Sequence, residues 1–111
     1  MVINIAEQFS LYPAGRTHLD GPDNGKRFRE ELLAPALRAA AAAAGEKVTV
    51  VLDGVRSFGS SFLEEAFGGL IRKEEFLRPQ LASILEIEAK AKEYGTYKRL
   101  IERYILEAKA E

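Results

Sequence analysis

Two adjacent serines, Ser60 and Ser61, form the part of this sequence that is best suited to chemistry. They follow a β-branched apolar run, Val48–Leu52, and a short loop that begins at Asp53. From Phe62 onward, apolar residues recur with helical spacing. A strand therefore delivers two hydroxyls to the start of a helix, where unpaired backbone N–H groups and the helix dipole favour an anion such as a phosphate.

The two serines are not equivalent in this pattern. Ser61 and Glu64 have the spacing of a capping box, in which the serine accepts a hydrogen bond from the backbone N–H of residue 64 and the glutamate reaches back. Ser60 lies just outside the helix that this box would begin. It is either a plain loop serine or a hydroxyl that accepts a phosphate, and the negative charges of Glu64 and Glu65 oppose the second role.

Other residues with chemical potential are few. Asp53 could bind an ion, orient the Ser60 loop or cap the turn before Gly54. His18 is the only histidine, and the chain has no cysteine. There is no Ser-His-Asp order, no phosphate-binding P-loop and no dinucleotide-binding glycine motif. The sequence therefore predicts a protein that is not an enzyme, with no cofactor and no metal site.

Composition limits the remaining classes of protein. The chain has 111 residues, which predicts one domain over residues 1–111. Its 16 basic and 17 acidic residues give a net charge of -1, which argues against a dedicated nucleic-acid binder. No apolar run approaches the roughly 20 residues of a membrane helix, and no secretory signal is present. With no cysteine, these features predict a cytoplasmic protein.

Helical and strand periodicities alternate along the chain. Glu86 and Glu88 lie on one side of the last predicted strand, so one face of the sheet should be open to water or to a partner. Pro35 should kink the first helix or divide it into two abutting helices, because it lacks a backbone N–H. The pattern predicts an α/β fold with a mixed four- to five-stranded sheet and helices mainly on one face. The predicted strands are Val2–Phe9, Arg16–Leu19, Val48–Leu52 and Ser83–Ala89, and the predicted helices are Asn24–Ala44, Ser61–Lys73 and a helix from Thr96 onward.

Two segments carry a resemblance to a known family. They are GRTHLDGPDNGKRFREELLAPAL, from Gly15, and LDGVRSFGSSFLEEAFGGL, from Leu52. Together they resemble the STAS-like domain family of unknown function, which is similar to the STAS domains of bacterial anti-sigma-factor antagonists. The resemblance covers residues 3–108. Its most specific parts are the strand–loop–Ser-Ser–helix block and the block formed by Gly15, Arg16, Asp20, Gly21, Phe28 and Arg29.

The resemblance implies a role for the Ser60 loop. STAS antagonists have an acidic residue, two hydroxyl residues and Gly-Leu at this position, and a partner kinase phosphorylates the first hydroxyl. Ser60 falls on that phosphoacceptor position, while Gly59 replaces the acidic residue and Phe62 replaces the glycine. The implied function is a regulatory protein-interaction module that acts in partner switching. Its implied partner is an ATP-binding kinase-like protein, and phosphorylation of Ser60 would weaken docking.

The same loop supplies the candidate contact residues. Arg56, Phe58 and Phe62 are of the types that dominate binding hot spots, and Asp53 and Gly59 complete the loop. Two other functions remain open. One is a small-ligand or nucleotide-binding domain that uses the same helix N-terminus. The other is a structural subunit that self-associates through its edge strand.

Overall fold

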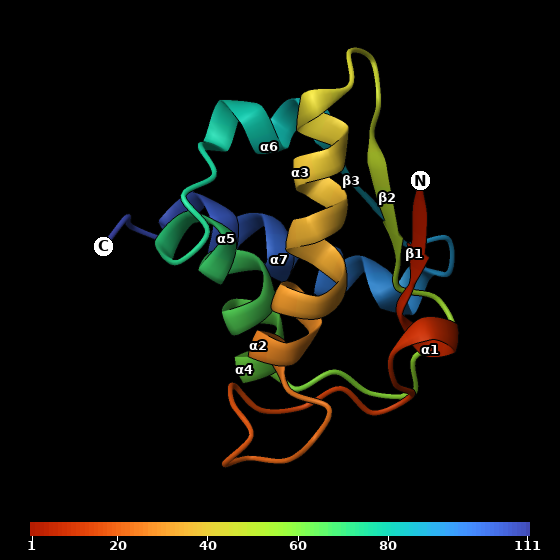
Figure 1. The fold of residues 1–111 in the computed structure, drawn as a ribbon. Helices are drawn as coiled ribbons and strands as arrows, with labels where there is room; N and C mark the ends of the chain where they lie inside the picture. Colours follow the sequence, from red (N-terminus) through yellow and green to blue (C-terminus); the bar gives the residue numbers. More distant parts are fainter.

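A three-stranded parallel sheet forms one layer of the fold. In the computed structural model, which describes residues 1–111, the strand order is β1–β2–β3. The sheet lies at the right of Figure 1, and most of the helices lie to its left. The strands are β1 (Val2–Asn4), β2 (Val48–Val51) and β3 (Leu85–Glu88).

The two faces of this sheet differ in burial. Ile3, Val50 and Ile87 are aligned across the strands and are buried beneath the helices. Val2 and Glu86 lie one residue earlier on β1 and β3, so their side chains project from the other face, where both are exposed. The helices therefore cover one face, and the other face is open.

The sequence prediction of a mixed four- to five-stranded sheet is wrong, because the sheet has three strands and all are parallel. The first strand is shorter than predicted and ends at Asn4. The Asn4 side chain accepts a hydrogen bond from the backbone N–H of Glu7 at 3.1 Å, and so caps a helical turn, α1 (Ile5–Gln8). Capping at Asn4 therefore ends the strand that the alternation of apolar residues extends to Phe9.

The predicted strand Arg16–Leu19 is also absent, and turns occupy the segment. The carboxylate of Asp20 accepts hydrogen bonds from the backbone N–H groups of Arg16, at 2.9 Å, and Thr17, at 3.3 Å. These local bonds occupy donors that a sheet ladder would need. The segment therefore folds back on itself instead of pairing with β1.

The first long helix is continuous but changes its winding ahead of Pro35. Asn24 caps its start by accepting a hydrogen bond from the backbone N–H of Arg27 at 2.8 Å. The backbone N–H of Ala34 bonds to the carbonyl of Arg29, five residues earlier, which makes one π-helical turn. This wider turn accommodates a proline, which would otherwise clash with the carbonyl four residues before it. The segments are α2 (Gly25–Phe28), the π turn Arg29–Leu33 and α3 (Ala34–Ala42).

The second long helix follows β2 and also contains a π-helical turn. Its segments are α4 (Ser60–Leu63), the π turn Glu64–Gly68 and α5 (Gly69–Arg72). The adjacent glycines, Gly68 and Gly69, make room for side chains. A Cβ on Gly69 would overlap the guanidinium of Arg29, and a Cβ on Gly68 would overlap the carboxylate of Glu64.

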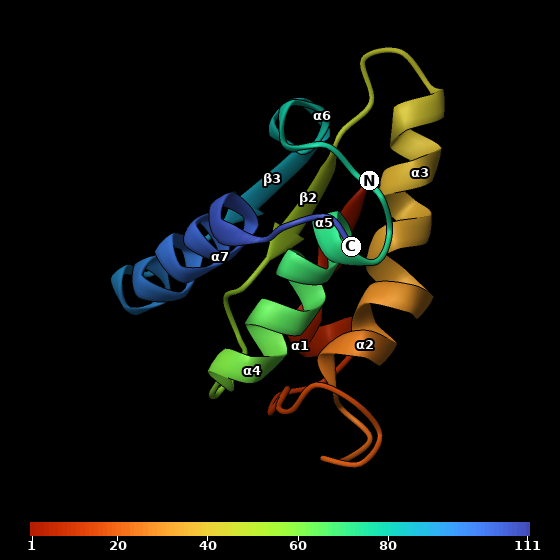
Figure 2. The same cartoon turned by 90° about the vertical axis from the view of Figure 1, so that its left-hand side faces the viewer.

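Two further helices complete the domain. A short helix, α6 (Arg78–Ile84), precedes β3 and has no counterpart in the sequence prediction. The last helix, α7 (Gly95–Glu107), begins one residue before the predicted start and follows a 3-10 turn, Lys92–Tyr94. Figure 2 shows α7 and the α4–α5 helix side by side, with α3 beyond them. Ile101 of α7 is fully buried in this packing.

One charged residue lies inside the core. Arg29 is only 2% exposed, which is rare for a charged side chain. Its Nη1 donates to a carboxylate oxygen of Glu65 at 2.7 Å and to the backbone carbonyl of the same residue at 2.6 Å. Its Nε donates to the carboxylate of Glu74 at 3.0 Å. Arg29 therefore joins the first long helix to the second by charged hydrogen bonds.

Candidate functional site

The Ser60 loop lies at the end of the sheet where β2 terminates. Two backbone hydrogen bonds attach it to the segment Leu11–Pro13: the N–H of Arg56 donates to the carbonyl of Leu11 at 2.8 Å, and that of Gly59 donates to Pro13 at 3.0 Å. The two loops lie side by side at the bottom of Figure 1. Because both attachments are backbone bonds, the loop is held in place whatever its side chains contact.

The helix begins at Ser60, one residue before the predicted start. Gly59 is the N-cap residue, with φ -75° and ψ 136°, and no side chain caps the helix. The predicted capping box of Ser61 and Glu64 is therefore wrong. The carboxylate of Glu64 instead accepts hydrogen bonds from Arg16 at 2.6 Å and from Arg72 at 2.8 Å. These longer-range ion pairs direct the glutamate away from the helix start.

Both serine hydroxyls are exposed, and the backbone around them has unused donors. The first helical N–H group to find an acceptor in this turn is that of Leu63, which donates to the carbonyl of Gly59 at 3.2 Å. The N–H groups of Ser60, Ser61 and Phe62 make no hydrogen bond in the structure. The two serines lie at a polar hollow of about 510 Å³, which is lined by Gly15, Arg16, Asp20, Gly59, Ser60 and Ser61.

Arginines offset the acidic residues that follow these serines. Partial burial tends to raise the pKa of Glu64, but the hydrogen bonds from Arg72 and Arg16 outweigh it and hold the pKa below its usual value. The carboxylate of Glu65 lies 2.7 Å from Arg29. The repulsion that the sequence predicts between these glutamates and an anion on Ser60 is therefore reduced by three guanidinium groups.

Two of the predicted contact residues are part of the core. Phe58 is 8% exposed and Phe62 is fully buried. The ring centroid of Phe58 lies 4.9 Å from that of Tyr97, and the ring centroid of Phe62 lies 5.6 Å from that of Phe28. A buried ring cannot contact a partner without unfolding the loop, so the prediction for Phe58 and Phe62 is wrong. Arg56 is exposed and stays a candidate.

The exposed apolar side chains at this end come from the neighbouring loop. Leu11 is 42% exposed, Tyr12 59% and Leu19 85%. The sequence predicts a turn at Leu11 and Tyr12 and a strand that ends at Leu19, so it does not identify these residues as exposed contacts. The attachment of Leu11–Pro13 to the Ser60 loop brings Leu11 beside Arg56.

Asp53 fixes the chain that follows β3. Its carboxylate accepts hydrogen bonds from the backbone N–H groups of Lys90 and Ala91, each at 2.8 Å. Desolvation tends to raise the pKa of Asp53, but the N–H groups of Ala91 and Lys90 outweigh this effect and lower it. The Asp53 side chain therefore orients the segment after β3, which is a different role from the three considered from the sequence.

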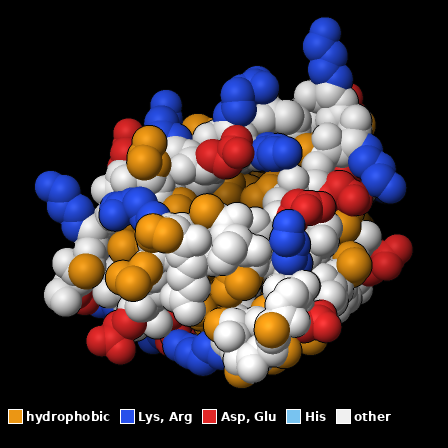
Figure 3. Space-filling model, turned by 90° about the horizontal axis from the view of Figure 1, so that it is seen from above, with side chains coloured by type: hydrophobic (Ala, Val, Ile, Leu, Met, Phe, Trp, Pro, Cys, Tyr) orange, Lys and Arg blue, Asp and Glu red, His pale blue; other side chains and the backbone are white.

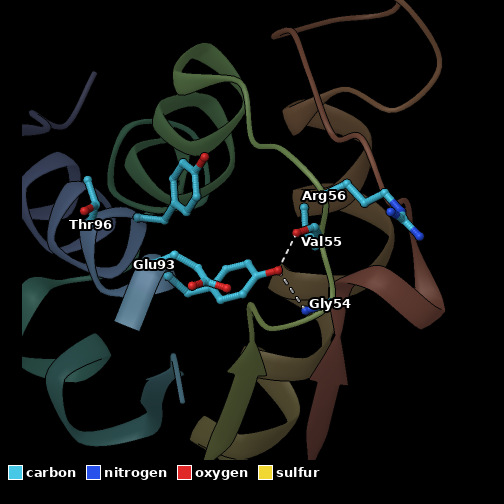
Figure 4. A pocket seen from close by; sticks show the side chains of 7 residues that line it. Gly54, Val55, Arg56, Glu93 and Thr96 are labelled. Carbon is cyan, nitrogen blue, oxygen red and sulfur yellow. Dashed lines mark hydrogen bonds between the residues drawn. The ribbon is translucent and has the colours of Figure 1, made fainter. Parts of the chain in front are cut away.

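A second hollow, of about 620 Å³, lies beside the first residues of the Ser60 loop. The hydroxyl of Tyr94 accepts a hydrogen bond from the N–H of Gly54 at 3.2 Å and donates to the carbonyl of Val55 at 2.6 Å (Figure 4). Figure 4 also shows the Arg56 side chain extended away from Glu93, so the charged groups do not converge. The hollow is lined by Gly54, Val55, Arg56, Glu93, Tyr94, Thr96 and Tyr97.

The sequence does contain a signal for this second hollow. The carboxyl ends of parallel strands meet at one edge of a sheet, where ligand sites of α/β proteins are found. A parallel assignment for β3 would have placed the tyrosines that follow it, Tyr94 and Tyr97, beside the end of β2. The mixed sheet that the sequence predicts does not fix that placement.

No three His, Cys, Asp or Glu side chains gather closely enough to hold a metal ion. None of the helices combines the length and the apolar character needed to cross a bilayer.

Comparison with known proteins identifies the family. The model of the STAS-like domain of unknown function matches residues 24–87, which is more than half of the chain. This range includes Arg29, the Ser60 loop and both long helices. No curated protein and no solved structure matches the chain. The chain thus belongs to the family of STAS-like domains of unknown function, as the resemblance of its two motif blocks predicts.

Proposed function

We propose that this STAS-like domain is a non-enzymatic protein-interaction module that docks a partner through its loop end and is switched by phosphorylation of Ser60. The loop end is the surface formed by Leu11, Tyr12, Leu19, Arg56 and Ser60. The observation that carries the proposal is the exposed Ser60 hydroxyl at an uncapped helix start, on a loop bonded to one with exposed apolar side chains.

Protein docking is supported by the composition of the loop end. Large apolar side chains that gather on a surface are typical of interaction sites, whereas isolated ones need no explanation. Leu11 and Tyr12 are adjacent in the chain, Arg56 is bonded to Leu11 through its backbone, and Leu19 is exposed further along the same loop. Tyrosine and arginine are the residue types most enriched in binding hot spots.

Switching at Ser60 is supported by access and by electrostatics. A kinase can reach an exposed hydroxyl on a surface loop, and the free N–H groups of the first turn favour the added charge. A phosphate adds about -1.5 to -2 charges at pH 7. A partner that presents acidic groups to Arg56 would then meet a phosphate beside them, and docking would weaken. The family resemblance favours an ATP-binding kinase-like partner.

Capture of partners from cell extract by immobilised variants tests the proposal. We expect a protein that binds the wild-type chain and Ser60→Ala, and that is lost with Ser60→Asp and with Tyr12→Ser. Ser83→Asp is the matched control, because Ser83 is exposed on α6, away from the loop end. Equal capture by wild type and Ser60→Asp, with all variants folded, would contradict switching at Ser60. Equal capture by Tyr12→Ser would contradict docking at the loop end.

A second candidate function is binding of a small ligand in the hollow of about 620 Å³ beside Tyr94 and Tyr97. Its position at the carboxyl end of β2 favours it. A thermal-shift screen with nucleotides separates the two functions, because a ligand that binds the native state raises the melting temperature. Tyr97→Ala should abolish such a rise.

A further inference from the structure

The strand β3 lies at the edge of the sheet, and its outer side has unpaired backbone groups. The N–H of Leu52 donates to the carbonyl of Glu88 at 3.0 Å, so Glu88 faces β2. The direction of backbone groups alternates along a strand, so the N–H and C=O of Ile87 point away from β2. No hydrogen bond in the structure satisfies either group. Such an edge is a template for another strand.

A groove of about 480 Å³ follows this edge. It is formed by β3, α6, α7 and Lys47 ahead of β2. Half of its lining is charged, with Glu86 at the strand edge and Lys47, Arg78, Lys98 and Glu102 around it, and half is apolar: Leu81, Ala82, Leu85, Ile87 and Ile105. Leu85 belongs to the helix-covered face of β3 and Glu86 to the open face, yet both line the groove. The groove therefore straddles the edge, where an added strand would lie. Figure 3, which views the end with α6, shows apolar side chains in a hollow bordered by charged ones.

A second copy of the chain does not suit this edge. A two-fold axis would pair β3 with itself antiparallel, with residues of one face opposite each other. If the axis passed through Glu86, Glu86 would face Glu86, and if it passed through Ile87, Glu86 would face Glu88. Like charges directly opposite each other destabilise a sheet. Glu86 forms no ion pair in the structure, and Glu88 has only Lys90, at 3.7 Å.

The same charges suit a different occupant. We propose that the edge of β3 binds an extended segment of a partner protein in which basic and apolar residues alternate. The basic side chains would lie opposite Glu86 and Glu88 on the open face, and the apolar ones would fill the groove against Leu81, Leu85 and Ile105. The backbone would pair with Ile87, as in β-strand addition. This surface lies near α6, away from the loop end, so it does not depend on the function proposed above (Figure 1).

A synthetic peptide tests this surface on the full chain. The probe is acetyl-Lys-Val-Lys-Val-Lys-Val-Lys-amide, titrated at physiological salt and followed by amide NMR shifts and hydrogen exchange. We expect saturable shifts and slowed exchange at the amides of Ile87 and Ala89. A peptide with glutamate in place of every lysine should bind at least about ten-fold more weakly, a difference of about 1.4 kcal/mol.

Charge reversal on the protein provides the converse test. Glu86→Lys with Glu88→Lys should weaken the lysine peptide about ten-fold and strengthen the glutamate peptide. Glu93→Lys is the matched control, because Glu93 is also exposed but lies in the other hollow. The proposal is overturned if the lysine peptide gives no saturable shifts at millimolar concentration, or if the shifts avoid Ile87. Protection of Ile87 without peptide, in a chain that is a dimer by light scattering, would assign the edge to a second copy and overturn it too.

Discussion

Replacing Arg29 by alanine should destabilise the domain more than any other change of a charged residue. The side chain is 2% exposed and makes three hydrogen bonds, two of them to carboxylates that are themselves 13% and 12% exposed. Removing one member of a buried ion pair typically costs about 3–5 kcal/mol, because it leaves the other charge without its partner. A void beside Gly69, where the guanidinium lies, adds to this cost.

Other arginines limit the loss. In the Arg29→Ala variant, the Glu74 carboxylate would still pair with the guanidinium of Arg38, which lies 2.6 Å away. The Glu65 carboxylate would still pair with the guanidinium of Arg16, which lies 3.5 Å away. We therefore expect Arg29→Ala to cost about 3 kcal/mol, the lower end of the range for buried pairs. Arg38→Ala is the matched control. Its side chain is 55% exposed, so its ion pair with the same glutamate should contribute less than about 1 kcal/mol.

Urea unfolding of the wild type, Arg29→Ala and Arg38→Ala at pH 7 measures both quantities. If the free energy of unfolding falls with urea concentration at the same slope in all three proteins, the shift in the urea midpoint gives the change in the free energy of unfolding. If Arg29→Ala lost no more stability than Arg38→Ala, the buried guanidinium would not be a major support of the fold. Arg29→Lys serves as a further check. Lysine keeps the charge but lacks the planar fork, so it should recover only part of the loss.

Three further predictions concern the second helix and its ion pairs. Phe67→Ala should cost about 3–5 kcal/mol in urea unfolding, because the ring is fully buried; an unchanged midpoint would show that the ring contributes little to the core. Ser61→Ala should change stability by less than about 0.5 kcal/mol, since no side chain caps the helix, and a loss above 1 kcal/mol would restore the capping role. The pKa values of Glu64 and Glu74 are lowered in the folded chain. The stability that these groups contribute should therefore be constant at a pH above their ordinary pKa values, and it should be lost as the pH falls through the folded-state pKa values. Melting temperatures that do not change over this acid range would contradict these ion pairs.

Apolar periodicity predicted the elements in which no side-chain hydrogen bond competes with the pattern. The apolar run of β2 and the helical spacing of α7 both appear in the structure within a residue or two of the predicted bounds. The number and direction of the strands were not predictable in this way, because they depend on whether a side chain or a neighbouring strand accepts the backbone hydrogen bonds. At Asn4, one side-chain cap ends β1, and at Asp20, one carboxylate replaces a strand by turns.

The candidate site shows the same division. The serine pair lies at a helix start after a buried strand, as its pattern predicts. The capping box fails because Glu64 pairs with Arg16, which is 48 residues away in the chain. Phe62 fits equally well as a contact residue or as a core residue when only its neighbours in sequence are considered. In the structure, Phe62 packs against Phe9 and Phe28, which come from other elements, so it is a core residue.

The contacts that hold the second helix explain how a phosphate on Ser60 could change the charge at the helix start without unfolding the helix. Arg29 holds the middle of this helix through Glu65, and Arg72, eight residues further along the helix, holds Glu64. The loop before Ser60 is fixed by the backbone bond between Gly59 and Pro13. None of these contacts uses the Ser60 hydroxyl, so modification would leave them in place. A phosphate there would change mainly the charge of the loop end, and this is the property that a charge-dependent partner detects.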